Sequence, residues 1–300
     1  MCVDFAQNMD VPHFGKEQPA DIYYYSPLTV NIFGCSDLTR FPTIMNAYGY
    51  TEAEGGKGSN NVASLIIKAL NDFGWLIEGC TGKQLFIVMD NCGGQNKNNN
   101  VLRLALYLVE LKYFERVEFA FFIRGHTKND CDLLFNQLKL RWHKSNTYTM
   151  GQMVECLNRQ PNVNFVEVKS DIFMDYGTLL GTYYKQFPPA VFQMNHIFWV
   201  ESANTTTMHM KRYSEDDDPF SYCFIINNTI HNNRFSSLKD FEHQTLPRPG
   251  IKPIKQVELY KKWRPFVPEP FKDEICPRPP DKILIQVRDE RNKKARQRRG

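Results

Sequence analysis

Three aspartates in this chain stand where carboxylates can do metal chemistry. Asp90 ends the apolar run 85–89 and is followed by a glycine pair and a cluster of amides. Asp132 follows a second apolar run, 117–123, and Asp4 lies among apolar residues at the start of the chain. Carboxylate oxygens are preferred ligands of Mg²⁺ and Mn²⁺. Two such ions, about 3.5–4 Å apart, would activate a nucleophile and stabilise the leaving oxygen of a phosphoryl transfer.

Each acid also has an ordinary structural explanation. Asp4 would be a strand-end acid, although an unpaired charge among apolar neighbours is costly. Asp90 would cap the turn made by the glycine pair, because acids and glycines favour turns. Asp130 competes with Asp132 for the third position, and residues two apart on a helix point about 200° from one another, so only one of them faces the site. We favour Asp132, with Asp130 as a candidate N-cap.

Polar groups suited to phosphate lie near these acids in the sequence. We expect contacts to a nucleic-acid backbone from six of them: Gln95, Asn96, Lys97, His126, Lys128 and Lys139. His126 could also act as a general acid or base, because its pKa lies near physiological pH, or it could close its loop as a structural histidine. The alternative for the residues after the glycine pair is a solvated polar start of a helix.

The elements that position the acids follow from apolar periodicity. The pattern predicts three strands, a helix, a strand, a helix, a strand and a helix, over residues 1–5, 22–34, 46–51, 59–70, 85–89, 100–113, 117–123 and 130–143. Ser59 is the expected N-cap of the first helix. The order predicts an α/β fold with an RNase H-like mixed five-stranded sheet flanked by helices, in which a β-meander continues into parallel strands. Asp4 then lies in the first strand, Asp90 ends the fourth, and Asp132 opens the last core helix.

The periodicity weakens after residue 147. We expect a helix over 171–186, strands at 197–200 and 222–226, and an irregular C-terminal accessory region with an extended arm, because prolines recur from residue 247 onward. The predicted organisation has three parts: an RNase H-like core at 1–147, an accessory region at 148–275, and a Pro-rich and then basic tail at 276–300.

Composition narrows the compartment and the partners. The formal net charge is only +4, but the basic end at 288–299 could neutralise phosphates, serve as a nuclear address, or be a solvated tail. Eight cysteines without a Cys-x-x-Cys pair indicate a reducing compartment and neither a zinc knuckle nor a disulfide framework. The lack of an apolar leader or spanning run predicts an intracellular protein without a membrane partner.

The glycine cluster at 55–59 lacks the spacing of an ATP-binding phosphate loop. The start directly at a strand is what a fragment or a truncated product would show.

The segments Asp90-Asn-Cys-Gly-Gly-Gln-Asn-Lys-Asn98 and Gly125-His-Thr-Lys128 resemble motifs of transposon-derived, RNase H-like proteins of the DDE/D transposase and integrase type. The resemblance extends to residues 4–8 and 58–64, and more loosely to 250–268. It implies that Asp4, Asp90 and Asp132 form an acidic triad for two Mg²⁺ or Mn²⁺ ions, with DNA as substrate and a nuclear location; oligomerisation is left open. An acid is common in such families where this chain has Asn61, so the alternative is a degenerate, inactive module that binds nucleic acid or protein.

Overall fold

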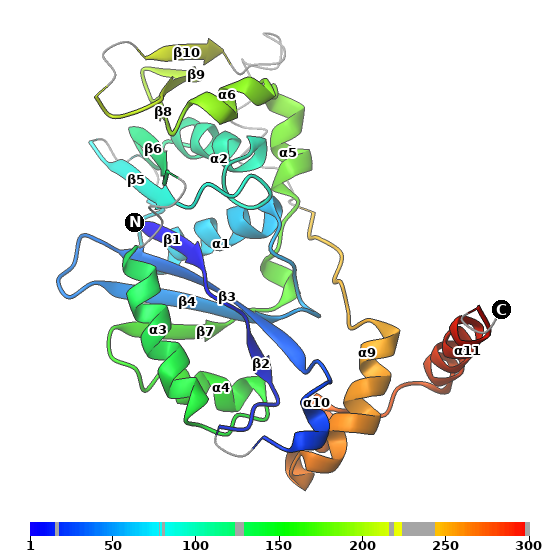
Figure 1. The fold of residues 1–300 in the computed structure, drawn as a ribbon. Helices are drawn as coiled ribbons and strands as arrows, with labels where there is room; N and C mark the ends of the chain where they lie inside the picture. The colour runs from blue at the N-terminus through cyan, green and yellow to red at the C-terminus, as the bar shows by residue number, and fades with distance from the viewer. Residues whose placement is uncertain are drawn as a thin grey trace.

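The chain folds as an α/β structure built on one mixed β-sheet, as predicted. The computed structural model describes residues 1–300 except 16–17, 78, 80–81, 124–128, 216–218, 224–243 and 298–300. Within this described part, ten strands form the sheet, in the order β10-β9-β8-β6-β5-β1-β3-β4-β7, with β2 also paired to β3 (Figure 1). The five predicted strands therefore form its centre, and further strands extend it.

The first part of the sheet is the predicted β-meander. β1 (Cys2–Phe5) and β2 (Met9–Val11) follow one another along β3 (Leu28–Asp37), and both pair with it antiparallel. β3 in turn pairs antiparallel with β4 (Ile44–Thr51) along its length.

Parallel strands follow the meander, as predicted. β5 (Gln84–Met89) runs parallel to β1, and β6 (Arg116–Phe121) runs parallel to β5. α1 (Ser59–Asp72) connects β4 to β5, and α2 (Asn99–Glu110) connects β5 to β6. α3 (Asp130–His143) follows β6. Because β1, β5 and β6 share one direction, their C-terminal ends meet at one edge of the sheet, and two of the predicted acids lie there.

Strands from the region after residue 147 widen the same sheet at both edges. β7 (Val163–Glu167) pairs parallel with β4. Beyond β6 the sheet continues antiparallel through β8 (Ile197–Glu201), β9 (Asn204–Lys211) and β10 (Phe220–Cys223). The predicted strand at 222–226 falls partly on β10 and partly outside the described residues.

Helices cover both faces of the sheet. α1, α2 and α5 (Tyr176–Tyr183) pack on one face, and α3 and α4 (Met150–Leu157) pack on the other (Figure 1). Successive residues of β3 serve the two sides alternately, as the pleat requires: Phe33 lies in the core beneath α1 and α2, and Ile32 lies in the core beneath α3.

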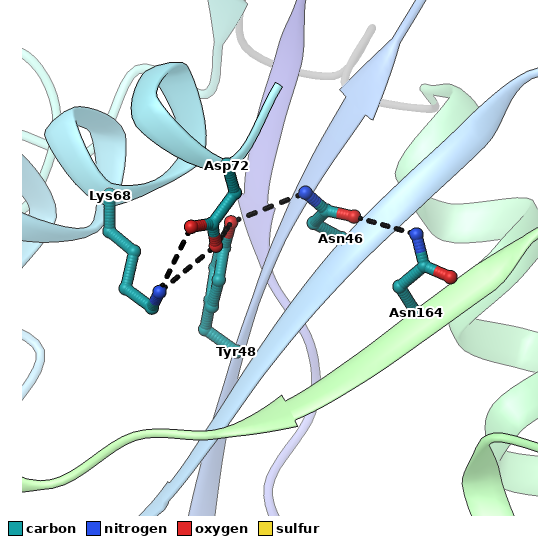
Figure 2. Close-up of polar contacts among 5 residues, drawn as sticks. All are labelled: Asn46, Tyr48, Lys68, Asp72 and Asn164. Carbon is teal, nitrogen blue, oxygen red and sulfur yellow. Dashed lines mark hydrogen bonds and ion pairs between the residues drawn. The ribbon is translucent and has the colours of Figure 1, made fainter. Parts of the chain in front are cut away.

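A polar chain that is buried at Asn46 and Tyr48 and more exposed at its two ends connects the β4–β7 edge to α1 (Figure 2). Asn164 of β7 donates to Asn46 Oδ1 at 3.1 Å, and Asn46 donates to Tyr48 Oη at 3.4 Å. Tyr48, which is fully buried, donates to Asp72 Oδ2 at 2.8 Å. Lys68 completes the chain with an ion pair to Asp72 at 3.0 Å, so every polar side chain in it has a partner.

The C-terminal part differs from the irregular arm predicted by its proline content. Short helical segments follow residue 252, namely α9 (Pro253–Glu258), a π-helical turn (Leu259–Trp263), 3₁₀ turns (Arg264–Phe266 and Glu269–Phe271) and α10 (Lys272–Ile275). The 17-residue α11 (Asp281–Gln297) then packs against α9. The prediction of an extended arm was wrong because several prolines occupy first helical turns, where a missing N–H costs nothing, and none lies within α11.

Three smaller predictions are also corrected. Residues 20–22 form a 3₁₀ turn (Ala20–Ile22) and not the start of a strand. The helix expected over 171–186 is a 3₁₀ turn (Ser170–Ile172), followed by the eight-residue α5; α6 (Pro189–Met194) comes later. The N-cap of α1 is Gly58 and not Ser59. None of the described helices has the length and apolar character needed to cross a bilayer.

Candidate active site

Asp4 and Asp90 are brought together by adjacent parallel strands. Asp4 lies in β1, and Asp90 directly follows β5. Cys2 is paired with Val88 in the parallel register, which places Asp4 level with Asp90 two residues further on. The negative charge of Asp90 contributes to the raised pKa of Asp4, so the two carboxyl groups lie within electrostatic reach.

Asp4 has a raised pKa. Burial raises its pKa to about 6; the charges of Asp90 and Asp132 add to the rise, and hydrogen bonds oppose it. Asn129 Nδ2 donates to Asp4 Oδ2 at 2.9 Å, and the amide N–H of Phe5 donates to Asp4 Oδ1 at 2.7 Å. Asp4 therefore has a fixed orientation and a proton affinity near physiological pH.

Asp90 is held by the polar loop that follows it. Asn96, which is 1% exposed, donates a hydrogen bond from Nδ2 to Asp90 Oδ1. The same oxygen accepts from the N–H of Cys92 at 3.3 Å, so Asp90 also caps the turn, as its structural explanation predicted. Turn cap and site residue are here compatible, because these bonds leave Asp90 Oδ2 without a partner among the described residues.

The other asparagines of this loop have structural partners. Asn98 is the N-cap of α2, and its Oδ1 accepts from the N–H groups of Asn100 and Val101 at 3.1 Å each. Asn99 Oδ1 accepts from the N–H of Phe187 at 2.7 Å. Asn100 Nδ2 donates to Ser59 Oγ at 2.8 Å. These asparagines therefore fix the start of α2, which follows the loop that contains Asp90.

Asp132 lies on the site side of α3, and Asp130 is exposed. Asn129 is the N-cap, which corrects the expectation for Asp130. Asn129 Oδ1 accepts from the N–H of Asp132 at 3.2 Å, and Asp132 Oδ2 accepts from the N–H of Asn129 at 3.1 Å, a reciprocal capping box. Asn129 therefore joins Asp4 to Asp132, since its Oδ1 serves the cap while its Nδ2 holds Asp4.

Lys57 is a cation close to Asp4. Its Nζ donates to the carbonyl of Ala6 at 3.4 Å and lies 4.8 Å from the centroid of the Phe5 ring. Burial lowers the pKa of Lys57, and the charge of Asp4 opposes this effect. Within the described part of the chain, no lysine or arginine forms an ion pair with Asp4, Asp90 or Asp132.

The three acids fit divalent cations in chemistry, with one restriction on their arrangement. Oxygen donors and uncompensated negative charge suit Mg²⁺ or Mn²⁺. However, among the residues that the structure describes, no three His, Cys, Asp or Glu side chains are grouped so that they could hold one metal ion. The charges of Asp90 and Asp132 both contribute to the raised pKa of Asp4, so the three carboxyl groups lie within electrostatic reach of one another without forming such a group.

The six residues predicted to contact nucleic acid are placed differently from one another. Asn96 and Lys97 are 1% and 5% exposed, which leaves little of either for a phosphate, and Lys97 Nζ lies over the Phe121 ring. Gln95 is half-buried. Lys139 donates to Gln7 Oε1 at the surface of α3. His126 and Lys128 lie outside the described residues.

A family model matches residues 26–216, which is more than half of the chain. Its description is "Domain of unknown function (DUF7869)". The chain belongs to this family. The comparisons with curated proteins and with solved structures find no match. The matched range contains Lys57, Asp90, Asn129 and Asp132, whereas Asp4 precedes it.

The site of this DUF7869 chain contains two residues that sequence reasoning missed. Asn129 was overlooked because the next residue, Asp130, was favoured as the N-cap, although Asn is as good an N-cap as Asp. Lys57 lies in the glycine cluster that failed the spacing of a phosphate loop. Its signal was a lysine between glycines directly before a helix, which brings a cation to the edge of the sheet without that motif.

Proposed function

We propose that this chain is a transposon-derived nuclease or transposase of the RNase H-like DDE/D type, which acts on DNA by metal-assisted phosphoryl transfer. Asp4, Asp90 and Asp132 are the ligands and catalytic acids of the proposal. The observation that carries it is the placement of Asp4 beside Asp90 at the C-terminal ends of parallel strands, with the pKa of Asp4 raised to about 6. Strongly perturbed acids clustered at a sheet edge are typical of functional sites.

The chain's own residues would position the reaction. Asn96 and the N–H of Cys92 fix Oδ1 of Asp90, and Oδ2 has no partner among the described residues. Asn129 fixes Asp4 and, through the capping box, the start of α3 with Asp132. Lys57 lies close enough to favour a phosphate near the acids. When bound, a pair of Mg²⁺ or Mn²⁺ ions would lower the pKa of water and stabilise the leaving oxygen.

DNA as the partner and a nuclear location belong to the same proposal. The basic end of the chain at residues 288–299 supports both, because clustered Lys and Arg neutralise phosphates and also form nuclear addresses. A fluorescent fusion of the full chain, compared with a fusion lacking 288–300, tests the location: equal distribution of the two would contradict the address.

A nicking assay tests the activity. Supercoiled plasmid is incubated with the full chain in Mg²⁺ or Mn²⁺, and Asp90→Asn is expected to lower the nicking rate on the order of 100-fold or more. Asn at this position keeps an oxygen for the N–H of Cys92, so the loop is preserved. Asp130→Asn is the matched control, since this exposed acid lies two residues from Asp132. Absence of nicking by the wild type, or nicking that survives Asp90→Asn, would contradict catalysis.

A second candidate is a non-catalytic module that binds nucleic acid or a protein. It is favoured by the use of these acids in structural bonds: Asp132 closes a capping box, and both oxygens of Asp4 accept hydrogen bonds. This candidate predicts DNA binding without divalent ions and no nicking, with equal affinity for wild type and Asp90→Asn in a fluorescence-anisotropy titration.

A further inference from the structure

A pocket between α2 and α5 contains a buried arginine that the proposed reaction does not use. The cavity measures about 490 Å³ and opens to solvent. Arg103 of α2, Lys185 and the glycine-bearing side of α5 line it. Its lining comes from α2, α5 and the residues next to them, and both helices pack on the same face of the sheet as α1 (Figure 1).

Among the residues that the structure describes, Arg103 has no acidic partner. It is 4% exposed, and its Nε donates to the backbone carbonyl of Lys185 at 3.1 Å. A guanidinium has five N–H donors, and no carboxylate among the described residues forms an ion pair with this one. Burial lowers the pKa of Arg103, and no neighbouring acid opposes the shift. A buried charge without a partner is costly, so its retention calls for a ligand that compensates it.

The surroundings of Arg103 favour an anion. Lys185 is exposed at the rim and adds a second positive charge. A Cβ at Gly181 would lie 3.4 Å from Arg103 Nη1, so glycine leaves this side of the guanidinium uncovered. The one carboxylate in the lining, Asp175, accepts hydrogen bonds from Asn60 Nδ2 at 2.8 Å and Thr178 Oγ1 at 2.7 Å.

Three helix N-termini also meet beside the pocket. Asn60 Oδ1 of α1 accepts from the N–H of Gly177 in the first turn of α5 at 2.7 Å, and Asn100 of α2 bonds to Ser59 of α1 at 2.8 Å. The positive ends of the helix dipoles therefore converge on this region and stabilise negative charge there.

We infer that this pocket binds a phosphate group, with Arg103 as its main ligand and Lys185 at the rim. Arginine is suited to this role because its planar fork pairs with two oxygens of a phosphate at once. The phosphate belongs either to a nucleic-acid backbone or to a free phosphate. The inference does not depend on the proposed catalysis, because it concerns binding at a separate set of residues.

Thermal unfolding of the full chain tests the pocket. Inorganic phosphate at ten times its Kd is expected to raise the Tm of the wild type by about 3 °C relative to chloride of equal ionic strength. Arg103→Met should abolish the rise, and in chloride its Tm should equal or exceed that of the wild type, since a buried unpaired charge is removed. A merely structural arginine gives the opposite pattern: Arg103→Met lowers Tm in chloride, and the response to phosphate is unchanged. That pattern, or no response of the wild type, would overturn the inference.

A second variant covers the case in which Arg103→Met does not fold. Lys185→Ala keeps the carbonyl that binds Arg103 and is expected to weaken phosphate binding about threefold to tenfold, whereas Lys261→Ala, an exposed lysine of the C-terminal part, leaves it unchanged. Equal affinity of the two variants for phosphate would overturn the role of Lys185 at the rim.

Fluorescence anisotropy with a labelled oligonucleotide then separates the two sources of the phosphate, a nucleic-acid backbone and a free phosphate. Competition by phosphate and loss of oligonucleotide affinity in Lys185→Ala identify a backbone phosphate, and unchanged oligonucleotide affinity identifies a free phosphate.

Discussion

The raised pKa of Asp4 makes a quantitative prediction for stability. The folded protein holds a proton on Asp4 up to about pH 6, whereas the unfolded chain loses it near 3.8. Between these values the folded state binds more protons, so the free energy of unfolding falls as pH rises through this window. A difference of about two pH units corresponds to about 3 kcal/mol. Asp4 is only half-buried, and solvent screening reduces the expected loss to about 1–2 kcal/mol.

Asp4→Asn removes this ionisation while keeping the size of the side chain. The variant loses the acceptor for Asn129 Nδ2, which costs stability at every pH, so the informative quantity is the change in unfolding free energy between pH 4 and pH 7.5. The wild type should lose about 1–2 kcal/mol more over this interval than Asp4→Asn does. Urea denaturation of both proteins at the two pH values measures the difference, because groups that do not interact with Asp4 titrate alike in both.

Two results would refute this reasoning in separate ways. Equal pH dependence of the wild type and Asp4→Asn would show that the Asp4 carboxyl is not desolvated, and a carbon-detected NMR titration of its side chain giving a pKa near 4 would agree. The proposed cation site has its own readout, since Mg²⁺ at pH 7.5 should stabilise the wild type and not the variant. Equal stabilisation of the two by Mg²⁺ would remove Asp4 from the set of ligands.

Two further substitutions test the supports of the site and of the sheet. Asn129→Ala should lower the unfolding free energy by about 1–2 kcal/mol through the lost N-cap. It should also raise the pKa of Asp4 above about 6, because the lost hydrogen bond favours the ionised carboxyl; urea denaturation and NMR titration measure the two effects, and an unchanged pKa would contradict the Asn129–Asp4 bond. Tyr48→Phe should cost about 1–3 kcal/mol by leaving Asn46 and Asp72 without the hydroxyl (Figure 2), whereas Tyr23→Phe, 74% exposed, should stay within about 0.5 kcal/mol. Equal losses of unfolding free energy in both tyrosine variants would show that the polar chain from Asn164 to Lys68 contributes no stability.

The central fold was predictable because its signals are local. The apolar runs that became β5 and β6 and the helical spacing of α1, α2 and α3 lie within single elements, and their order predicts a meander joined to parallel strands. Of the strands that widen the sheet, β7 and β9 were not predicted: β7 has only five residues and pairs with β4, far away in the sequence, and β9 begins with an Asn and three Thr residues. Proline count misled the prediction for α11, because a proline affects only its own position and the residues beside it.

The site shows where a residue pattern stops being informative. The sequence places Asp4 and Asp90 at strand ends, but whether they meet depends on the register of β1 against β5, which is set by the whole sheet. The amides after Asp90 would be polar both as contacts to a nucleic-acid backbone and as a solvated start of a helix. In the structure most of them form hydrogen bonds within the protein, as helix caps or as contacts to neighbouring segments. A short polar segment can satisfy its own backbone donors as readily as it can bind a ligand, so composition alone does not separate the two.

The hydrogen bonds that hold Asp4 and Asp90 in place bear on function. Asn96 and Asn129 donate amide hydrogen bonds to Asp90 and Asp4, and the bond from Asn129 lowers the pKa of Asp4. Nevertheless the pKa of Asp4 remains near 6, because burial and two neighbouring charges outweigh its two hydrogen bonds. A fold selected only for stability could remove this cost by replacing Asp4 with an apolar residue, as its neighbours in β1 already are. The cost is instead retained where Asp4 lies within electrostatic reach of Asp90 and Asp132, and in the proposed function a bound cation would offset it.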